Sequence, residues 1–259
     1  MVTIRLNASE IAVITGHNKY QDINELRDKI LIRNGLQKGV LIKTDIQKKL
    51  VNITDKVILQ NIKKELKLDV TATKKEIEKK INDICITPQL NKKTEKESHN
   101  QLDTTLNNLP IVKELLKKSA YSDLIKARGT NNESKALNKV EMITKLRIQK
   151  RNDTLYQREL YNDEVCKIIL QGKIDGMINN DTVVESKNRS RRLFYKIPDY
   201  EKVQLEAYLY LTNTGKALHI ENYDKITNES YYYHNEDFWS QCKQTIIDYI
   251  TQELVTFIH

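Results

Sequence analysis

Residues 170–211 have the sequence LQGKIDGMINNDTVVESKNRSRRLFYKIPDYEKVQLEAYLYL. Asp175 follows a short apolar run, a polar turn comes next, and a second apolar run leads directly into Glu185-Ser186-Lys187. Two apolar runs joined by a short polar turn predict a β-hairpin, which would bring both carboxylates to one edge of a sheet. Lys187 lies two residues after Glu185, so both side chains are expected on the same face of the strand.

This pair of acids and its lysine suit one kind of chemistry. Two carboxylates at close range repel one another unless a cation lies between them. Oxygen ligands of this kind bind Mg²⁺ or Mn²⁺, and a nearby ammonium group can orient water and stabilise charge that develops on a phosphate. The pattern therefore predicts metal-dependent hydrolysis of a phosphodiester. The alternative is that an acid in a turn and an exposed Glu-Lys alternation on an edge strand have no function at all.

Several ordered motifs resemble the PD-(D/E)XK nuclease superfamily and, within it, the phage lambda-type exonucleases, also called YqaJ-like viral recombinase nucleases. They are ASEIAVITGHNKY, ARGTNNESKAL, GKIDG, VVESKNR and YEKVQLEAYLYL, and together they span roughly residues 1–35 and 119–215. The resemblance implies an α/β fold with a restriction-endonuclease-like core. We expect a mixed central β-sheet of about four to six strands, flanked by helices, with a helical insertion.

The resemblance also assigns the site residues. Five side chains match the catalytic positions: Glu133, Asp175, Glu185, Lys187 and Gln204. The metal, Mg²⁺ or Mn²⁺, would be bound by Asp175, Glu185 and the backbone carbonyl of Ser186. Lys187 would orient or deprotonate the attacking water, with the remaining two residues in support. The family often has a hydrophobic residue where this chain has Ser186, but a backbone ligand tolerates that change. Without the resemblance, Glu133 would be interpreted as an acid that interacts with the dipole of its helix.

Contacts to nucleic acid are predicted at three places. The resemblance implies that Ser9 binds a terminal 5′-phosphate, whereas a lone Ser before a helix more often caps it. It also makes Arg128 a candidate phosphate contact. A third place is the loop after the acidic hairpin, where arginines 189, 191 and 192 precede Phe194, Tyr195 and Lys196. A basic and aromatic loop of this kind could hold a nucleic-acid strand against the site.

The composition is compatible with a polyanionic partner. The chain has 259 residues with 43 Lys and Arg against 35 Asp and Glu, a formal net charge of +8. Cys85, Cys166 and Cys242 occur singly, which excludes the usual spacings of zinc and iron–sulfur ligands and indicates reduced thiols. No signal peptide or membrane span is evident, so we expect a soluble intracellular protein of the cytoplasm or nucleus, with a viral source among the possibilities.

We expect three segments: residues 1–35 and 119–259 form the nuclease core, and residues 36–118 form a Lys-rich helical insertion. From Gln37 to Glu97 there are fifteen lysines, nine acids and no arginine. Within it, helices are predicted after Thr54 and after Thr73, and the polar stretch 90–108 is predicted to be a mobile linker. The insertion either grips nucleic acid or a partner protein, or is a solvated helical pair.

The remaining elements are predicted from pattern and capping. Strands are expected at 2–6, within 152–171, and as an antiparallel pair at 216–224 and 229–235. A helix is expected to end at Gly129 and another to begin at Thr130 or Asn131. Further helices are expected over 24–34, over 200–213 after Asp199 as the cap, and over 235–258. His219, His234 and His259 lack partners in the sequence and are expected to be non-catalytic.

Together these observations predict a metal-dependent DNA nuclease, an exonuclease that processes duplex ends in recombination or repair, with a recombination protein as a further partner. Two alternatives stay open. One is a structure- or sequence-specific endonuclease that acts on DNA or RNA. The other is a non-catalytic nucleic-acid-binding or partner-binding module. The family contains ring-shaped trimers and monomers, so the oligomeric state is left open.

Overall fold

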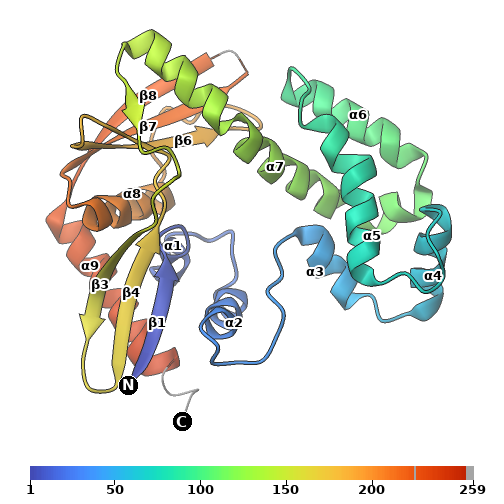
Figure 1. Ribbon diagram of the computed structural model, residues 1–259, viewed down its shortest axis with the longest axis horizontal. Coiled ribbons are helices and arrows are strands. Elements are labelled where there is room, and N and C mark those ends of the chain that lie inside the picture. Colours follow the sequence, from blue (N-terminus) through green and yellow to red (C-terminus); the bar gives the residue numbers. More distant parts are fainter. Residues whose placement is uncertain (225, 255–259) are drawn as a thin grey trace. The chain divides into compact units, whose positions relative to one another are not determined.

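The computed structural model describes residues 1–224 and 226–254, without the side chains of residues 143 and 144. The chain divides into two compact units, one made of Met1–Leu41 with Glu133–His259 and the other of Ile42–Asn132 (Figure 1). The first unit is α/β and the second is built from helices. The predicted fold class, α/β with mixed sheet, flanking helices and a helical insertion, is confirmed. The helical unit begins and ends later in the chain than the predicted range 36–118.

The α/β unit contains two mixed sheets. The first has the order β1-β4-β3, with β1 parallel and β3 antiparallel to β4. The second has the order β2-β5-β6-β7-β8, with only β6 and β7 parallel among its described pairs. The strands are β1 Val2–Asn7, β2 Ile148–Gln149, β3 Tyr156–Asn162, β4 Cys166–Gly172, β5 Gly176–Ile178, β6 Thr182–Asn188, β7 Lys216–Tyr223 and β8 Ile226–Tyr233. The predicted strands are therefore present.

One detail differs from the prediction, because the strands form two mixed sheets and not one central sheet. The chain leaves the first sheet after Gly172 and enters the second at Gly176. Gly176 allows β2 to approach closely, since a Cβ atom there would lie 2.2 Å from Cγ2 of Ile148. The acidic hairpin therefore belongs to the five-stranded sheet, whereas the apolar strand that precedes it belongs to the other.

Helix α8, Asp199–Thr212, links the two sheets through its packing. It contacts β3 and β4 of one sheet and β6 and β7 of the other, as well as α1 and α9. Val183 of β6 belongs to the core that includes α8, while the next residue, Val184, packs with Leu137 and Val140 of helix α7, Pro110–Thr144. Alternation along β6 therefore places Glu185 and Lys187 on the face of Val183, toward α8.

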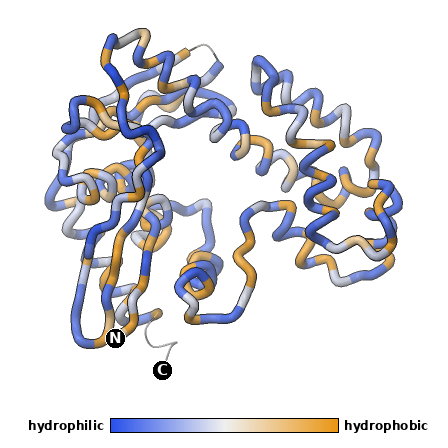
Figure 2. Tube along the Cα trace, in the orientation of Figure 1, coloured by the Kyte–Doolittle hydropathy of each residue, from blue (hydrophilic) through white to orange (hydrophobic). Residues whose placement is uncertain are grey.

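The remaining helices of this unit are α1 Ile11–Ile14, α2 Ile23–Arg33, α9 Glu236–Asp248 and the turn of π-helix Tyr249–Leu254. As expected, Trp239, Ile246, Ile250 and Leu254 are buried. Figure 2 shows β3 as mostly hydrophilic and β4 as more hydrophobic, which matches the position of β4 between β1 and β3. The end of the predicted helix 235–258, with His259, lies outside the described residues.

The helical unit contains α3 Asp45–Asn52, α4 Lys56–Glu65, α5 Lys74–Ile81, α6 Glu95–Asn107 and the first part of α7, with a π-turn at Asn82–Ile86 and a 3₁₀ turn at Thr87–Gln89. The prediction that Thr73 begins a helix is confirmed, because Thr73 and Glu76 form a reciprocal capping box. Asp55 caps α4 in place of Thr54. The helices enclose their own core, which includes Ile46, Leu50, Ile62, Ile77, Ile81, Leu102 and Leu116.

Two predictions for this part of the chain are wrong. The stretch 90–108 is not a linker, because α6 begins after Thr94 and buries Leu102 and Leu106, one helical turn apart. No break occurs at Gly129, where α7 continues to Thr144. A glycine inside a helix costs only about 1 kcal/mol relative to alanine, and a long helix with buried side chains on both sides of it can offset that cost.

A smaller difference concerns the caps of α8. Pro198, and not Asp199, is the N-cap of α8, while Asn213 ends that helix in the left-handed conformation with a φ of 56°. Cys85, Cys166 and Cys242 are free and buried. Among the described residues, no helix combines the length and the apolar character that crossing a membrane requires.

Candidate active site

The hairpin formed by β5 and β6 brings Asp175 beside Glu185, as predicted. Gly176 pairs with Val184, so the next step of the same register places Asp175 opposite Glu185. The backbone N–H of Ser186 donates a hydrogen bond of 2.7 Å to Oδ2 of Asp175. This bond holds the aspartate against the strand that carries the glutamate.

Glu133 of α7 joins these two acids. Its carboxyl group shares a hydrogen bond with Asp175, and the side-chain amide of Asn152 donates to it as well. Burial and the neighbouring charges of Glu185 and Glu133 raise the pKa of Asp175 well above its usual range. Burial and the charge of Glu185 also raise the pKa of Glu133. The site therefore concentrates negative charge that only a proton or a cation can balance.

Lys187 supplies one such cation. Its Nζ atom donates to Oε1 of Glu185 at 2.5 Å and to Oε1 of Gln204 at 3.0 Å. The amide of Gln204 in turn donates to the hydroxyl of Tyr208 at 2.9 Å. Burial lowers the pKa of Lys187, but the charge and hydrogen bond of Glu185 outweigh it, so the pKa is raised. Lys187 is therefore an ammonium donor in this arrangement, which suits orienting water better than deprotonating it.

One atom of the site is left without a partner. Glu185 is 3% exposed, and its Oε2 atom is buried without a hydrogen-bond partner among the described residues. A buried carboxylate oxygen in that state is costly unless a cation or donor reaches it. Carboxylate oxygens from Asp175 and Glu185, with Glu133 beside them, form the hard donor set that a divalent cation binds. The side chains therefore fit a divalent metal, although the described part of the chain has no group of three or more His, Cys, Asp or Glu already arranged around one.

Behind the site lies a buried network centred on Arg189. Its guanidinium binds Glu201 with two hydrogen bonds of 2.6 and 2.8 Å, and its Nε donates to Glu221 at 2.7 Å. His219 Nε2 lies 2.8 Å from the same Glu201 carboxylate. The prediction that Arg189 contacts nucleic acid is therefore corrected, because its donors are bound to two buried carboxylates. Its guanidinium also lies 4.2 Å from the ring centre of Phe194.

Arg128 requires a similar correction. It is 2% exposed within the helical unit, where its Nε donates to Glu95 at 2.9 Å. Its Nη1 donates to the backbone carbonyl groups of Gln89, Leu90 and Lys92. These hydrogen bonds stabilise the 3₁₀ turn and the chain that follows it. The buried guanidinium of Arg128 is therefore not accessible to a phosphate.

Other predicted contacts remain exposed. Ser9 lies in an exposed turn before α1, and the N-cap of this four-residue helix is Glu10, so the capping alternative for Ser9 is wrong. Its phosphate contact stays a prediction. Arg191 and Arg192 are exposed, and their contacts with nucleic acid also stay predictions, as does the role of the Ser186 carbonyl.

Several neighbours of the site were not predicted. Tyr208 follows Gln204 by one helical turn on α8, so the i, i+4 spacing was a usable signal. Asn152, with a φ of 50°, reaches Glu133 from a loop, and no spacing in the sequence indicates that contact. Glu201 and Glu221 appear in the sequence as ordinary acids of a helix and a strand. His219 was expected to be non-catalytic, and the structure shows it bonded to Glu201.

Comparisons with known proteins give a likeness only to solved structures. No family model matches the chain, and no curated protein matches it either. An alkaline exonuclease from Laribacter hongkongensis is 12% identical with a TM-score of 0.43, and the match covers 52% of this chain and 70% of that one. The same exonuclease in complex with dAMP gives 12% identity, a TM-score of 0.41, and coverage of 51% and 68%. A phage-related exonuclease from Haemophilus somnus is 11% identical with a TM-score of 0.36, and the match covers 48% of this chain and 67% of that one.

Proposed function

We propose that this chain is a nuclease that hydrolyses phosphodiester bonds of DNA with the help of a divalent metal. The observation that carries the proposal is the buried Glu185 beside Asp175 and Glu133. One of its oxygens accepts a hydrogen bond from the Lys187 ammonium, and the other has no partner within the part of the chain that the structure describes. A structural role alone does not account for an acid at this position, because burying an incompletely paired carboxylate destabilises the fold.

Mg²⁺ or Mn²⁺ would be held by Asp175, Glu185 and the carbonyl group of Ser186. A divalent cation bound there supplies Lewis acidity toward a phosphate oxygen. The repulsion that raises the pKa of Asp175 also favours the cation, since bound positive charge relieves it.

The protein side chains divide the remaining work. The Lys187 ammonium has three N–H groups, and after its bonds to Glu185 and Gln204 one is left to donate to the attacking water or to a phosphate oxygen on which negative charge develops. Gln204 holds that ammonium in place through its 3.0 Å hydrogen bond, and Tyr208 holds Gln204. Glu133, whose pKa is raised by burial and by Glu185, is suited to accept the proton that leaves the attacking water.

We propose duplex DNA ends as the substrate, in recombination or repair, with Ser9 near the terminal phosphate. The formal net charge of +8 favours binding of a polyanion and steers its approach. Arg191 and Arg192 are exposed on the loop that follows β6, in the same chain segment as Lys187. Backbone contacts from such a loop position a strand without reading its sequence. A recombination protein would be a further partner.

The test compares linear 5′-phosphorylated duplex DNA with covalently closed circular DNA, each incubated with Mg²⁺, with Mn²⁺ and with EDTA. Loss of the linear substrate alone, only with metal, is the result expected of an end-dependent exonuclease. Cutting of the circle as well would make the protein an endonuclease with the same site. Single-stranded DNA and RNA are included as further substrates.

The Lys187→Ala variant serves as the control for contaminating nucleases, and Lys167→Ala is its matched comparison. Lys167 lies on β4 of the three-stranded sheet in an ion pair with Glu159 at 2.7 Å, so its replacement removes a lysine without changing the site. Cleavage that persists equally in both variants would overturn the proposal. If none of these substrates is cleaved in the presence of metal, a non-catalytic binding module becomes the better explanation.

A further inference from the structure

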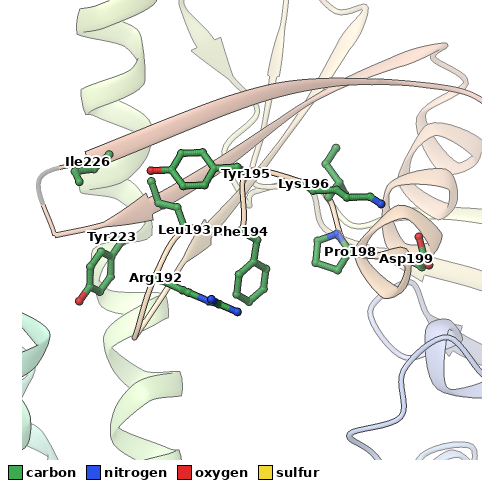
Figure 3. A pocket seen from close by; sticks show the side chains of 10 residues that line it. Arg192, Leu193, Phe194, Tyr195, Lys196, Pro198, Asp199, Tyr223 and Ile226 are labelled. Atoms are coloured by element: carbon green, nitrogen blue, oxygen red, sulfur yellow. The ribbon is translucent and has the colours of Figure 1, made fainter.

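The loop between β6 and α8, together with the last residue of β7 and the first residue of β8, lines an open cavity of about 820 Å³. Its lining combines aromatic, aliphatic and cationic side chains, including Arg192, Phe194, Tyr195, Lys196, Tyr223 and Ile226 (Figure 3). This cavity lies beside the chain segment that leaves Lys187, and the chemistry described above does not use it. Its volume is in the range of pockets that hold a small molecule or a single nucleotide.

Tyr195 is held in an unusual conformation at this cavity. Its backbone has a φ of 59°, in the left-handed region that bulky residues rarely occupy, and its side chain is 67% exposed. Neither feature stabilises the fold, because the ring gains little burial and the backbone is strained. Phe194 and Ile226 are also exposed, at 42% and 54%. Apolar exposure gathered at one concave place indicates a surface that binds something.

The loop is held in this shape by a buried carboxylate. Glu221 of β7, 1% exposed, accepts hydrogen bonds from the backbone N–H groups of Phe194 at 3.2 Å and Tyr195 at 2.9 Å. Arg189 binds the same Glu221 and contacts the face of the Phe194 ring. The backbone of the loop and the Phe194 ring are therefore held in place before any ligand arrives, which lowers the entropy lost on binding.

The charge at the cavity favours an anionic ligand. Arg192 and Lys196 are exposed on its lining, and Arg191 is exposed next to them in the sequence. Asp199 is an acid of the lining, but it pairs with Lys202 at 2.8 Å. In Figure 3 it lies at the opposite side of the view from Tyr223 and Ile226. A ligand with a flat apolar part and a phosphate would match both the rings and the cations.

We propose that this cavity binds one unpaired nucleotide of the substrate strand, with the base stacked on Tyr195 and its phosphate near Arg192 and Lys196. The inference rests on the proposed function in that it takes nucleic acid as the substrate. It adds that the preferred substrate has a single-stranded segment at the site, as opposed to a fully paired duplex. Stacking is tolerant of sequence because every base has an aromatic face, so no base preference is expected.

Binding in EDTA tests the cavity without any cleavage. A fluorescein-labelled duplex with a short single-stranded tail is compared with the same duplex whose tail carries abasic sites, and with a blunt duplex. The variant Tyr195→Asn removes the ring while tolerating the left-handed backbone, and Tyr195→Phe keeps the ring. The matched control is Tyr233→Ala, which removes a tyrosine of similar exposure, 66%, from β8. Circular dichroism verifies that each variant is folded.

Tyr195→Asn is expected to weaken binding of the tailed duplex roughly tenfold while changing that of the abasic tail by less than about twofold. Tyr195→Phe and Tyr233→Ala should bind both like the unmodified protein. Equal loss on normal and abasic tails, or no loss, would overturn the proposal. If cleavage depends on Lys187 but the Tyr195 effect is absent, the nuclease proposal stands and the nucleotide site falls. If the Tyr195 effect is present without metal-dependent cleavage, the nuclease proposal falls alone.

Discussion

The Nζ atom of Lys187 lies 2.5 Å from Oε1 of Glu185, two residues earlier on the same strand. The ammonium group thus already balances part of the negative charge that three carboxyl groups bring to the site. A divalent cation bound as proposed would act on the same acids as this lysine, and the effect of each on the other can be measured without following cleavage.

Replacing Lys187 by alanine should lower cleavage by at least roughly 100-fold, because the donor aimed at the water and phosphate is lost. Affinity for Mn²⁺, measured by isothermal titration calorimetry, should be unchanged or higher, since the competing positive charge is gone. Lys167→Ala should retain both properties. Loss of Mn²⁺ binding in Lys187→Ala would contradict the assigned role and would indicate that the lysine shapes the site itself.

Replacing Tyr208 by phenylalanine removes the hydroxyl that accepts a hydrogen bond from Gln204. We expect kcat to fall roughly fivefold with KM nearly unchanged, because one net hydrogen bond is worth about 1 kcal/mol and Gln204 positions Lys187. Tyr210→Phe is the control, since that hydroxyl on the same helix donates to the backbone of Glu159 away from the site. Equal kinetic losses in both variants would argue against a specific chain from Tyr208 to Lys187.

The Arg189 network should make the fold sensitive to acid. Burial raises the pKa of Glu201, but hydrogen bonds from His219 and Arg189 outweigh it and lower the pKa from 4.5 to about 2. A lowered pKa in the folded state gives stability that is present above about pH 4.5 and is lost as the pH falls toward 2. Its size is ~3 kcal/mol in the free energy of unfolding.

Glu201→Gln tests this directly in urea unfolding at pH 7 and pH 3. At pH 7 the variant should be less stable than the unmodified protein, because Arg189 and His219 lose their charged partner. The difference in the free energy of unfolding should be smaller at pH 3, because the stability that the Glu201 carboxylate contributes is partly lost at that pH. A difference that is equally large at both pH values would show that packing, and not the charge of Glu201, is responsible.

Arg128→Ala should destabilise the helical unit by about 3–5 kcal/mol, because Glu95 and several carbonyl groups lose a buried partner. Lys126→Ala, which removes an exposed ion pair with Asp45, should cost less than about 1 kcal/mol. Thermal unfolding measures both. If the Arg128→Ala protein is as stable as the unmodified protein but binds DNA more weakly, the result would support the prediction from the sequence that Arg128 contacts phosphate.

The acidic hairpin was predictable because its evidence is local. Strand alternation alone places Lys187 on the face of Glu185, and a short polar turn is enough to pair β5 with β6. The sequence could not show that Arg189 belongs to a different set of contacts from Arg191 and Arg192. The three arginines lie within four positions and look alike in the sequence. Arg189 differs from the exposed pair only through its contacts with Glu201 of α8 and Glu221 of β7, which are distant in the sequence.

The errors in the helices have a related cause. In the stretch 90–108 only Leu102 and Leu106 show the helical spacing among polar residues, too weak a signal to outweigh the composition. At Gly129 a local stop signal was overridden by side chains on both sides, such as Leu124 and Leu137, which are buried. Local preferences of about 1 kcal/mol decide an element only when packing does not.

The continuity of α7 limits how this protein can be shortened. The helix begins at Pro110 in the segment of the helical unit and runs without interruption past Glu133, which contributes a carboxyl group to the site. Excising residues 42–132 would make Glu133 the first residue of a cut helix. The opening backbone N–H groups there would have lost the carbonyl acceptors of the preceding turn. A shortened version of this chain that retains the candidate site would therefore have to keep the last turns before Glu133 or replace them with a new capping sequence.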